Sequence, residues 1–360
     1  MKIGILTFTN GTNIGQRLQN YALQETLRKY TDEVYTIKQK APYSLYELLK
    51  IQAKDFFLDL KNPLNLFLRK KREKLFQDFN RRFIAFYDKE LEFRGDNSWI
   101  SDEFDAFVVG SDQIWNPRSP YVGDNFFLDF ANPEKRFTYA PSFSIEKLPE
   151  SEICSYKKRL MGFEEISVRE DKGAEIIQSI TGRKCTVVLD PTFLITRDCW
   201  DKIKEGYPRN NENGYALCMF LGNTDLKDVR KIFKNNVIVV SNMTPISPAQ
   251  FLDIVERASI VFTDSYHVTI FSAIYHIPFV NFERKGTNIN MGSRFETLYR
   301  ELGIENRSWT YLKQHPKELY NMDFESIEKS LAEQRTKSFD FLDHTIGKRV
   351  EYLNPSKDGR

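Results

Sequence analysis

The feature of this sequence that most constrains its fold is a repeated alternation of short apolar runs, rich in β-branched residues, with helical segments of about 10–15 residues. The run at residues 2–8 precedes a helical pattern at 16–30, and the run at 164–170 precedes another at 171–182. Further runs occupy residues 104–110, 136–143, 184–194, 213–222, 235–241, 259–264 and 277–282. Because strands joined through helices lie parallel, with right-handed crossovers, the pattern predicts an α/β fold with parallel sheets.

The runs are too many for one open sheet of usual width, so we expect two Rossmann-like domains that face a central cleft. The predicted boundary falls near 181–191, which gives an N-terminal domain at 1–180 and a C-terminal domain at 181–323. A helical excursion at 44–90 interrupts the first domain. Residues 324–360 are expected to form a final helix that packs back on the N-terminal domain.

Composition argues against several classes of protein. With 41% hydrophobic and 28% charged residues the chain resembles soluble globular proteins, and its net charge of +2 argues against wholesale binding to nucleic acid. It has no apolar run of about 18 residues, and its first apolar stretch is too short for a signal peptide. The four cysteines are dispersed, as in reduced cytosolic proteins, and the four histidines lack metal-ligand spacing. We therefore expect a cytoplasmic protein without a metal.

The segment at residues 44–83 breaks the alternation. Its apolar residues fall at helical spacing, and RKKREK at 69–74 adds a dense basic patch. Such a segment can form an amphipathic helical pair on an anionic membrane surface, here the inner face of the plasma membrane. The alternative is a helical excursion with one solvated face, which is what a run of charges usually forms.

Polar residues follow many of the apolar runs, at the place where open α/β sheets bind ligands, outside the carboxyl ends of the strands. They come from both predicted halves, so we expect them to converge on a shared cleft. In chain order the candidates are Asn10, Asn13, Gln16, Ser111, Asp112, Gln113, Trp115, Asn116, Ser142, Arg169, Asp190, Asp264, Ser265 and His267. Amide side chains suit sugar hydroxyls because they offer both donors and acceptors, although a loop of this kind can also be a polar turn.

His267 is the sharpest candidate for chemistry. It stands between a strand end and the helical sequence HVTIFSAIYH, beside Asp264 and Ser265. An imidazole exchanges protons near neutral pH, so His267 can act as a general acid or base. The alternative is a histidine that only caps or packs the helix.

Two arginines are candidates for anion binding. Arg169 ends a strand before a predicted helix, where its guanidinium can hold a carboxylate or phosphate bidentately. An ion pair with Glu170 or Asp171 is the alternative. Arg294 opens another helix, where backbone amides add to an anion site. Asp190, in LDPTFL, is interpreted as a turn residue whose carboxylate bonds the backbone.

These stretches together resemble the polysaccharide pyruvyl transferase family. The family carries in this order NGTNIGQRLQNYALQ, VVGSDQIWNP, FTYAPSF, ISVREDKGAEII, VVLDPTFLI and FTDSYHVTIFSAIYHIPFV, and the resemblance runs from about residue 1 to 303. It implies a GT-B-like arrangement of two Rossmann-like domains. It also implies transfer of a pyruvyl group from phosphoenolpyruvate, without a further cofactor, to a sugar of a cell-surface polysaccharide or its lipid-linked precursor, forming a ketal.

The resemblance also implies roles for single residues. Arg169 matches the arginine of the family's SVRE motif and would bind an anionic group of the donor, and His267 matches the family's histidine and would be the general acid/base. The expected donor-binding residues are Arg169, Ser265, His267, Lys285 and Arg294. The expected acceptor-binding residues, on the N-terminal side, are Asn10, Asn13, Gln16, Ser111, Asp112, Gln113, Trp115, Asn116 and Ser142.

The chain departs from the family at residues 265–267, where SYH stands in place of an Arg-Leu-His triplet. One donor-binding cation is therefore missing, and Arg284, Lys285 and Arg294 are the candidates to replace it. Two other functions stay open on the same fold. One is a glycosyltransferase that uses a nucleotide sugar, and the other is a glycan-binding protein without catalysis.

Overall fold

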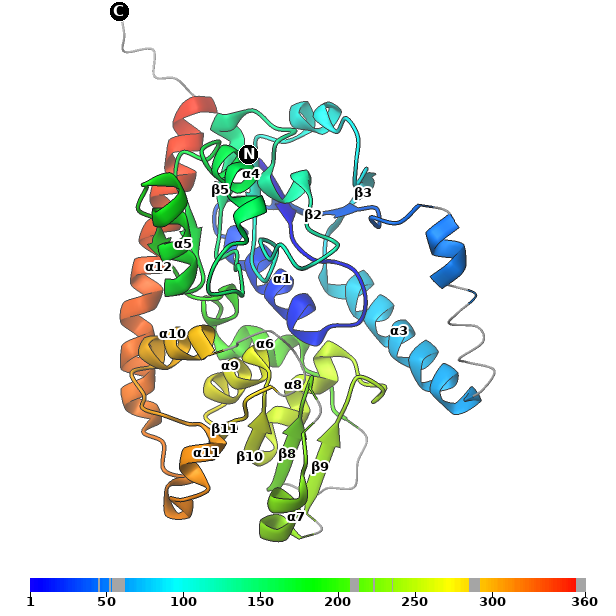
Figure 1. The fold of residues 1–360 in the computed structure, drawn as a ribbon, viewed down its shortest axis with the longest axis vertical. Coiled ribbons are helices and arrows are strands. Elements are labelled where there is room, and N and C mark those ends of the chain that lie inside the picture. Colours follow the sequence, from blue (N-terminus) through cyan, green and yellow to red (C-terminus); the bar gives the residue numbers. More distant parts are fainter. Residues whose placement is uncertain are drawn as a thin grey trace, which may run out of the picture.

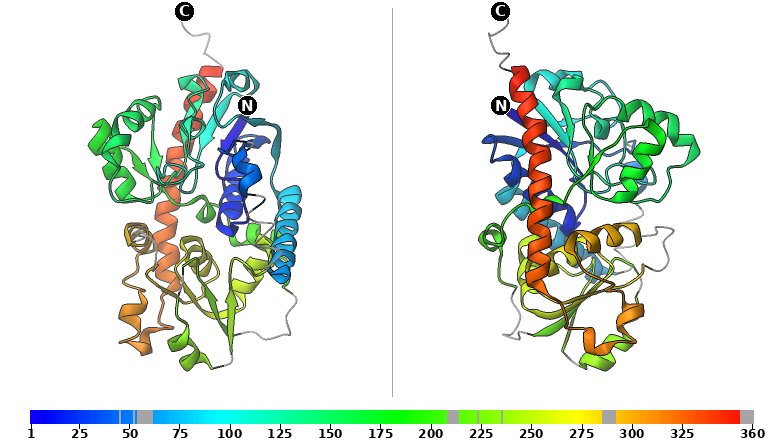
Figure 2. Two further views of the ribbon diagram at one scale, coloured as in Figure 1. Left: turned by 45° about the vertical axis from the view of Figure 1, so that its right-hand side comes forward. Right: turned by 90° about the vertical axis from the view of Figure 1, so that its left-hand side faces the viewer.

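The computed structural model describes residues 1–44, 46–51, 53, 62–207, 214–222, 224–234, 236–284 and 292–353. Figures 1 and 2 show two lobes stacked along the long axis, each built around a parallel sheet, with one long helix running beside both. Among the helices of these residues, none combines the length and apolar character needed to cross a membrane.

The first lobe holds a five-stranded sheet in the order β3-β2-β1-β4-β5, with every pair of neighbours parallel. Its strands are β1 (Lys2–Leu6), β2 (Glu33–Gln39), β3 (Phe86–Leu91), β4 (Ala106–Val109) and β5 (Arg136–Thr138). The chain moves outward from β1 to β3 and then returns to place β4 on the other side of β1. The strand order therefore reverses between β1 and β4, which is where such sheets bind ligands.

Longer helices and a small sheet complete the described residues of this part of the chain. The helices are α1 (Ile14–Leu27), α3 (Pro63–Phe83), α4 (Glu150–Leu160) and α5 (Asp171–Thr181). The small sheet pairs β6 (Ser167–Val168) with β7 (Thr186–Val187) in parallel. β7 follows the boundary predicted at residue 181 but pairs with a strand that precedes it, so the backbone passes between the lobes after β7.

The second lobe holds a four-stranded parallel sheet in the order β11-β10-β8-β9. Its strands are β8 (Tyr215–Met219), β9 (Val237–Val240), β10 (Ala258–Thr263) and β11 (Phe279–Asn281). Its helices are α6 (Arg197–Ile203), α7 (Lys227–Phe233), α8 (Pro248–Glu256), α9 (Tyr266–Ile274), α10 (Gly292–Leu302) and α11 (Trp309–Leu312). Here the order reverses between β8 and β10, which gives this lobe a switch point of its own.

Helix α12 (Phe324–Leu353) lies along both lobes (Figure 2). Its Ser330 hydroxyl donates to the carbonyl of Glu301 in α10, and its Ser338 hydroxyl accepts from the N–H of Leu189. Near its far end His344 lies 2.7 Å from Glu165 in the first lobe. A helix thus covers residues 324–353 of the segment predicted as the final helix, residues 354–360 lie outside the described part of the chain, and the helix contacts both lobes.

An apolar interface joins the two lobes beneath the cleft. The ring of Tyr21 in α1 lies 5.7 Å from Trp200 in α6, and Trp200 lies 4.9 Å from Phe271 in α9. All three belong to one continuous core cluster. Because apolar burial is the main favourable term in folding, this contact fixes the lobes at one separation and so positions the side chains above it.

The predicted α/β fold with parallel sheets is confirmed, but the predicted strands differ in detail. β2 and β3 were not predicted, because their sequences EVYTIKQ and FYDKEL mix apolar with charged residues, and the middle of β3 is exposed. The run predicted at 136–143 ends as a strand at Thr138. Ala140 and Ser144 take φ angles of 54° and 53°, which turns the chain out of the extended conformation.

Candidate active site

Both switch points open onto one pocket of about 410 Å³ between the lobes. The first lobe contributes the loops after β1 and β4, and the second contributes the loops after β8, β10 and β11. The lining residues are Phe8, Asn10, Gly11, Asn13, Gln16, Asp112, Gln113, Ser119, Tyr121, Leu221, Ser265, Tyr266, His267, Arg284 and Arg294. The expected convergence of strand ends from both halves is therefore observed.

A buried arginine shapes the loop between β1 and α1. The Arg17 guanidinium donates to loop carbonyls, including those of Phe8 at 3.3 Å and Gly11 at 2.8 Å. Burial lowers the pKa of Arg17 to about 10, so the group remains charged at neutral pH. The Asn13 side chain accepts a hydrogen bond from the N–H of Gln16 and caps α1. These contacts fix the loop while leaving its amide side chains at the pocket.

His267 lies in the first turn of α9 and packs against the first turn of α1. A Cβ at Gly15 would lie 2.3 Å from Nδ1 and 2.5 Å from Cγ of the imidazole, so any other residue here would force the ring to move. The His267 side chain is 12% exposed and lines the pocket. The two lobes therefore meet at the histidine that the sequence singled out.

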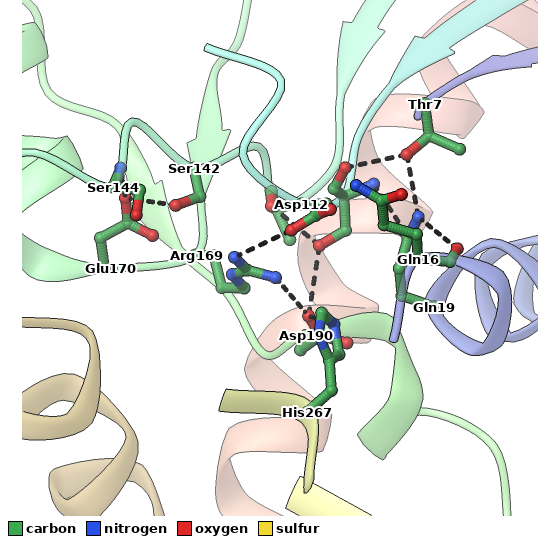
Figure 3. Close-up of polar contacts among 12 residues, drawn as sticks. Thr7, Gln16, Gln19, Asp112, Ser142, Ser144, Arg169, Glu170, Asp190 and His267 are labelled. Atoms are coloured by element: carbon green, nitrogen blue, oxygen red, sulfur yellow. Dashed lines mark hydrogen bonds and ion pairs between the residues drawn. The ribbon is translucent and has the colours of Figure 1, made fainter. Parts of the chain in front are cut away.

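Asp190 connects His267 to Arg169 (Figure 3). Its Oδ2 lies 2.8 Å from Nη1 of Arg169 and 3.5 Å from Nε2 of His267, and it accepts a hydrogen bond from the Ser111 hydroxyl at 3.3 Å. Its Oδ1 accepts from the N–H of Thr192 at 3.1 Å and from the Thr192 hydroxyl at 2.7 Å. The fully buried carboxylate thus has partners on both oxygens.

The charge state of Asp190 follows from these partners. Burial alone would raise the pKa of the carboxyl, but the charges of His267 and Arg169 and the hydrogen bond from Arg169 outweigh burial and hold the pKa below its usual range. Asp190 is therefore ionised at neutral pH. Its Oδ2 faces the imidazole at 3.5 Å, without a hydrogen bond between them, and supplies a counter-charge whenever the ring is protonated.

Arg169 does not reach the pocket surface. Its side chain is 1% exposed, its Nη2 lies 3.7 Å from Asp112, and the ring of Tyr266 lies 4.5 Å from its Cζ. Burial opposes its charge, but Tyr266 and the carboxylates raise the pKa of Arg169, so it stays protonated. The expectation that Arg169 binds a donor anion directly is corrected here, because the guanidinium is enclosed and already faces Asp190 and Asp112.

Two other arginines bring positive charge to the pocket wall. Arg294 of α10 is 2% exposed, and its Cζ lies 5.8 Å from the ring of Tyr266. Burial, aided by nearby Arg169, lowers the pKa of Arg294 to about 10, so it is charged at neutral pH. Arg284 follows β11, and its Nε donates to Asp264 at 3.2 Å. These are two of the three cations that were candidates to replace the missing arginine.

The remaining donor-side candidates are placed as follows. Ser265 is the N-cap residue of α9 and lines the pocket. Lys285 lies outside the described residues. Asp264, just before Ser265, accepts hydrogen bonds from the N–H groups of Leu221 and Gly222 at 2.7 and 2.8 Å. Asp264 therefore fixes the loop after β8 together with Arg284.

The loop after β4 turns sharply at its first residue. Gly110 has a φ of 139°, and a Cβ there would lie 1.8 Å from the carbonyl oxygen of Tyr139, so no other residue fits. Ser111 follows and is fully buried, with its N–H donating to Oε1 of Gln19 at 3.1 Å. Asp112 and Gln113 then line the pocket.

Four predicted acceptor residues do not line the pocket, and their assignments are corrected. Ser111 is buried against Asp190, and Asn116 is 4% exposed and accepts from the N–H of Arg118. Trp115 is fully buried, with its indole N–H donating to the carbonyl of Phe126 at 2.8 Å. Ser142, also fully buried, donates to Glu170 at 2.9 Å. These side chains hold the loops in place. The other five, Asn10, Asn13, Gln16, Asp112 and Gln113, line the pocket.

A second compartment of about 250 Å³ adjoins the pocket and shares Ser265 and His267 with it. Arg72 of α3 lines this compartment and donates to the Thr12 carbonyl at 2.9 Å and to the Thr244 carbonyl at 2.6 Å. Burial lowers the pKa of Arg72 to about 10. Since Thr12 and Thr244 belong to different lobes, Arg72 joins the lobes beside His267.

Three residues of this site had only weak signals in the sequence. Asp190 was interpreted as a turn residue, and the contacts of its second oxygen were not anticipated. Gly15 was not among the candidates. Arg72 was counted within the basic patch, although its spacing to Phe76 and Phe79 places it on the face of α3 that is buried.

Comparison with known proteins places this geometry in a family. A search of curated proteins gave no match. The family model described as polysaccharide pyruvyl transferase matches residues 13–286.

Among solved structures, UDP-GlcNAc 2-epimerase from Neisseria meningitidis aligns with a TM-score of 0.53 and 10% identity over 96% of this chain and 100% of that chain. The corresponding enzyme from Rickettsia bellii gives 0.53 and 10% over 99% of each chain. The wall teichoic acid polymerase TagF gives 0.50 and 12% over 98% and 90%. At such low identity these structures show the fold alone, and they confirm the predicted GT-B-like class. Because the family model covers more than half of the sequence, the chain belongs to the polysaccharide pyruvyl transferase family.

Proposed function

We propose that this protein transfers a pyruvyl group from phosphoenolpyruvate to two hydroxyls of one sugar, forming a ketal, with His267 as the general acid/base. The observation that carries the proposal is the chain of contacts from Arg169 through Asp190 to His267, at the edge of a pocket with two arginines in its wall. A proton-transfer group and an anion-binding wall in one pocket are what this reaction requires.

The donor is expected to bind near Arg284 and Arg294. Phosphoenolpyruvate carries a carboxylate and a phosphate, and guanidinium groups bind both with paired hydrogen bonds. These arginines lie in the second lobe beside Ser265, the place where the chain departs from the family. They therefore supply positive charge where this chain has serine in place of the family's arginine.

The proton steps balance with one histidine. His267 gives a proton to C3 of the enol, and the first sugar hydroxyl adds to the cationic C2 and returns its proton to His267. Phosphate then leaves as its bond to C2 breaks, and the second hydroxyl adds to C2 while its proton leaves with the phosphate. Asp190 stays ionised throughout and faces the ring, and Arg169 holds Asp190 as a positioning residue.

The acceptor is expected along the amide-lined wall of the first lobe. Asn10, Asn13, Gln16 and Gln113 offer donors and acceptors, which matches the hydroxyls of a saccharide. A polysaccharide precursor, including one linked to a lipid, fits the coarse function of the family.

Phosphate release from phosphoenolpyruvate, measured with a panel of free and lipid-pyrophosphate-linked saccharides, tests the proposal. His267→Asn should lower turnover by about 10²–10⁴-fold. His276→Asn is the matched control, because His276 lies just beyond the same helix, 43% exposed and paired with Glu328. Full activity of His267→Asn would contradict the assigned role. Thermal stabilisation by UDP-GlcNAc and not by phosphoenolpyruvate would instead favour a nucleotide-sugar enzyme.

A further inference from the structure

Exposed apolar side chains concentrate at the start of α3 and in the segment before it. Of the thirteen most exposed large hydrophobic residues in the described part of the chain, five lie within residues 46–67. Leu64 and Phe67, in the first turns of α3, are 64% and 62% exposed. In Figure 1 this end of α3 extends beyond the lobes at the edge of the molecule. These two side chains therefore have apolar surface that is left exposed by the part of the chain that the structure describes.

The exposed residues lie on the side of α3 that faces away from the protein. At 100° per residue, Leu64, Phe67, Lys70, Lys71 and Lys74 fall within an arc of about 120°. We call these five residues the outer face of α3. The buried residues Arg72, Phe76 and Phe79 fall on the opposite side. One side of the helix thus belongs to the core and the cleft, and the other is available to a partner.

The charge of this segment is strongly biased. Residues 62–83 contain seven basic side chains and two acidic ones, a difference of +5, whereas the whole chain has a net charge of +2. The basic residues are Arg69, Lys70, Lys71, Arg72, Lys74, Arg81 and Arg82, and the acidic ones are Glu73 and Asp78. Apart from buried Arg72 they lie at the surface, so the outer face combines apolar side chains at its tip with lysines one to two turns further on.

We propose that the outer face of α3 binds the surface of a membrane that contains anionic lipids. Leucine and phenylalanine side chains enter the boundary between headgroups and acyl chains, while lysines remain at the level of the phosphates. Apolar anchors next to a cluster of lysines match such a surface in both chemistry and charge. The inference does not depend on the proposed function.

The opposite side of the same helix reaches the active site. Arg72, the residue directly after Lys71, lines the compartment that contains His267. A lipid surface on the outer face would therefore lie one helix diameter from the cleft. This arrangement suits an acceptor whose sugar is presented at a membrane surface.

Sedimentation with vesicles tests the proposal on the full-length protein. We expect binding to vesicles of equimolar phosphatidylcholine and phosphatidylglycerol, and little binding to phosphatidylcholine alone. Each lysine near an anionic surface contributes about 5-fold in affinity, so Lys70→Glu/Lys71→Glu should weaken binding by at least about 25-fold. Leu64→Ala/Phe67→Ala should also weaken it, and raised salt should weaken the wild type.

Two matched controls come from another surface helix. Lys157→Glu/Lys158→Glu reverses two adjacent exposed lysines of α4, and Met161→Ala removes a side chain that is 53% exposed at the end of the same helix. Both should bind vesicles like the wild type. The proposal is overturned if the wild type does not bind anionic vesicles, or if the α3 variants bind as well as the controls. A dimer in solution that Leu64→Ala/Phe67→Ala disrupts would also overturn it, because a second copy of the chain would then cover the outer face.

Discussion

The substitution Gly15→Ala should displace His267 and lower activity, while the stability of the fold changes much less. The added Cβ would lie 2.3 Å from Nδ1 of His267, and ordinary van der Waals contact begins at 3.4 Å, so the ring and the helix must separate by 3.4 − 2.3 = 1.1 Å. A displacement of about 1 Å at a catalytic group lowers the rate by about 100-fold, or about 2.7 kcal/mol in the barrier.

Stability should change much less than activity. Gly15 lies in the first turn of α1 and has no positive φ, so alanine is compatible with its backbone. Alanine favours a helix over glycine by about 0.5–1 kcal/mol, which offsets part of the strain of moving the ring. The donor-side arginines lie outside this contact, so phosphoenolpyruvate should still raise the melting temperature of the variant.

The assay is phosphate release in the presence of acceptor, together with thermal unfolding with and without phosphoenolpyruvate. Two matched glycines serve as controls. Gly173, in the first turn of α5, would place a Cβ 3.4 Å from its nearest neighbours, and Gly347 of α12 would meet nothing within 4 Å. Alanine at either position should leave turnover unchanged. If Gly15→Ala keeps turnover within about threefold of wild type, the ring does not need its observed position, and the reasoning fails.

Three further predictions concern the groups around the site. Asp190→Asn should lower turnover by about 100-fold and stability by about 3–5 kcal/mol in denaturant titration, because Arg169 loses its closest counter-charge; unchanged stability would contradict the geometry. Arg72→Met should lower the free energy of unfolding by about 1.5–3 kcal/mol, whereas Arg69→Met, at the surface of the same helix, should stay within about 0.5 kcal/mol. Burial raises the pKa of Glu301, so the folded chain keeps a proton that the unfolded chain releases above about pH 4.3. The free energy of unfolding therefore falls by up to about 1.4 kcal/mol per pH unit above that value. Glu301→Gln should remove this slope, which gives a variant more stable than wild type at pH 7 and equal to it at pH 4; an identical pH profile would show that the carboxyl ionises normally.

The location of the site could be predicted from the sequence because topology determines it. Parallel strands present their carboxyl ends at one edge, so residues that follow different strands meet without any knowledge of side-chain packing. Asn10 after β1, Asp112 after β4 and His267 after β10 all line the pocket for this reason. This reasoning needs only the approximate ends of the strands, so the site could be predicted although β2 and β3 were not.

Side-chain direction within each loop could not be predicted. Asp112 takes a φ of 76°, in the region that favours glycine, and this turn sends Ser111 and Trp115 into the interior while Asp112 and Gln113 face the pocket. Nothing in GSDQIWN distinguishes a polar residue that binds a ligand from one that bonds a neighbouring strand. The polar content of the loop was therefore a sound guide to its position and a poor guide to the role of each residue.

Asp190 is both a turn residue and a site residue, so the two interpretations did not exclude each other. A carboxylate has two oxygens, and here Oδ1 bonds Thr192 to close the turn while Oδ2 faces Arg169 and His267. The turn fixes the carboxylate more firmly than a free side chain could be fixed, since both of its torsions are set by local hydrogen bonds. A rigid, ionised carboxylate is what an imidazole needs in order to keep one orientation while it gains and loses a proton. The turn thus places an ionised carboxylate beside His267, and an asparagine that preserved the turn would still remove the charge.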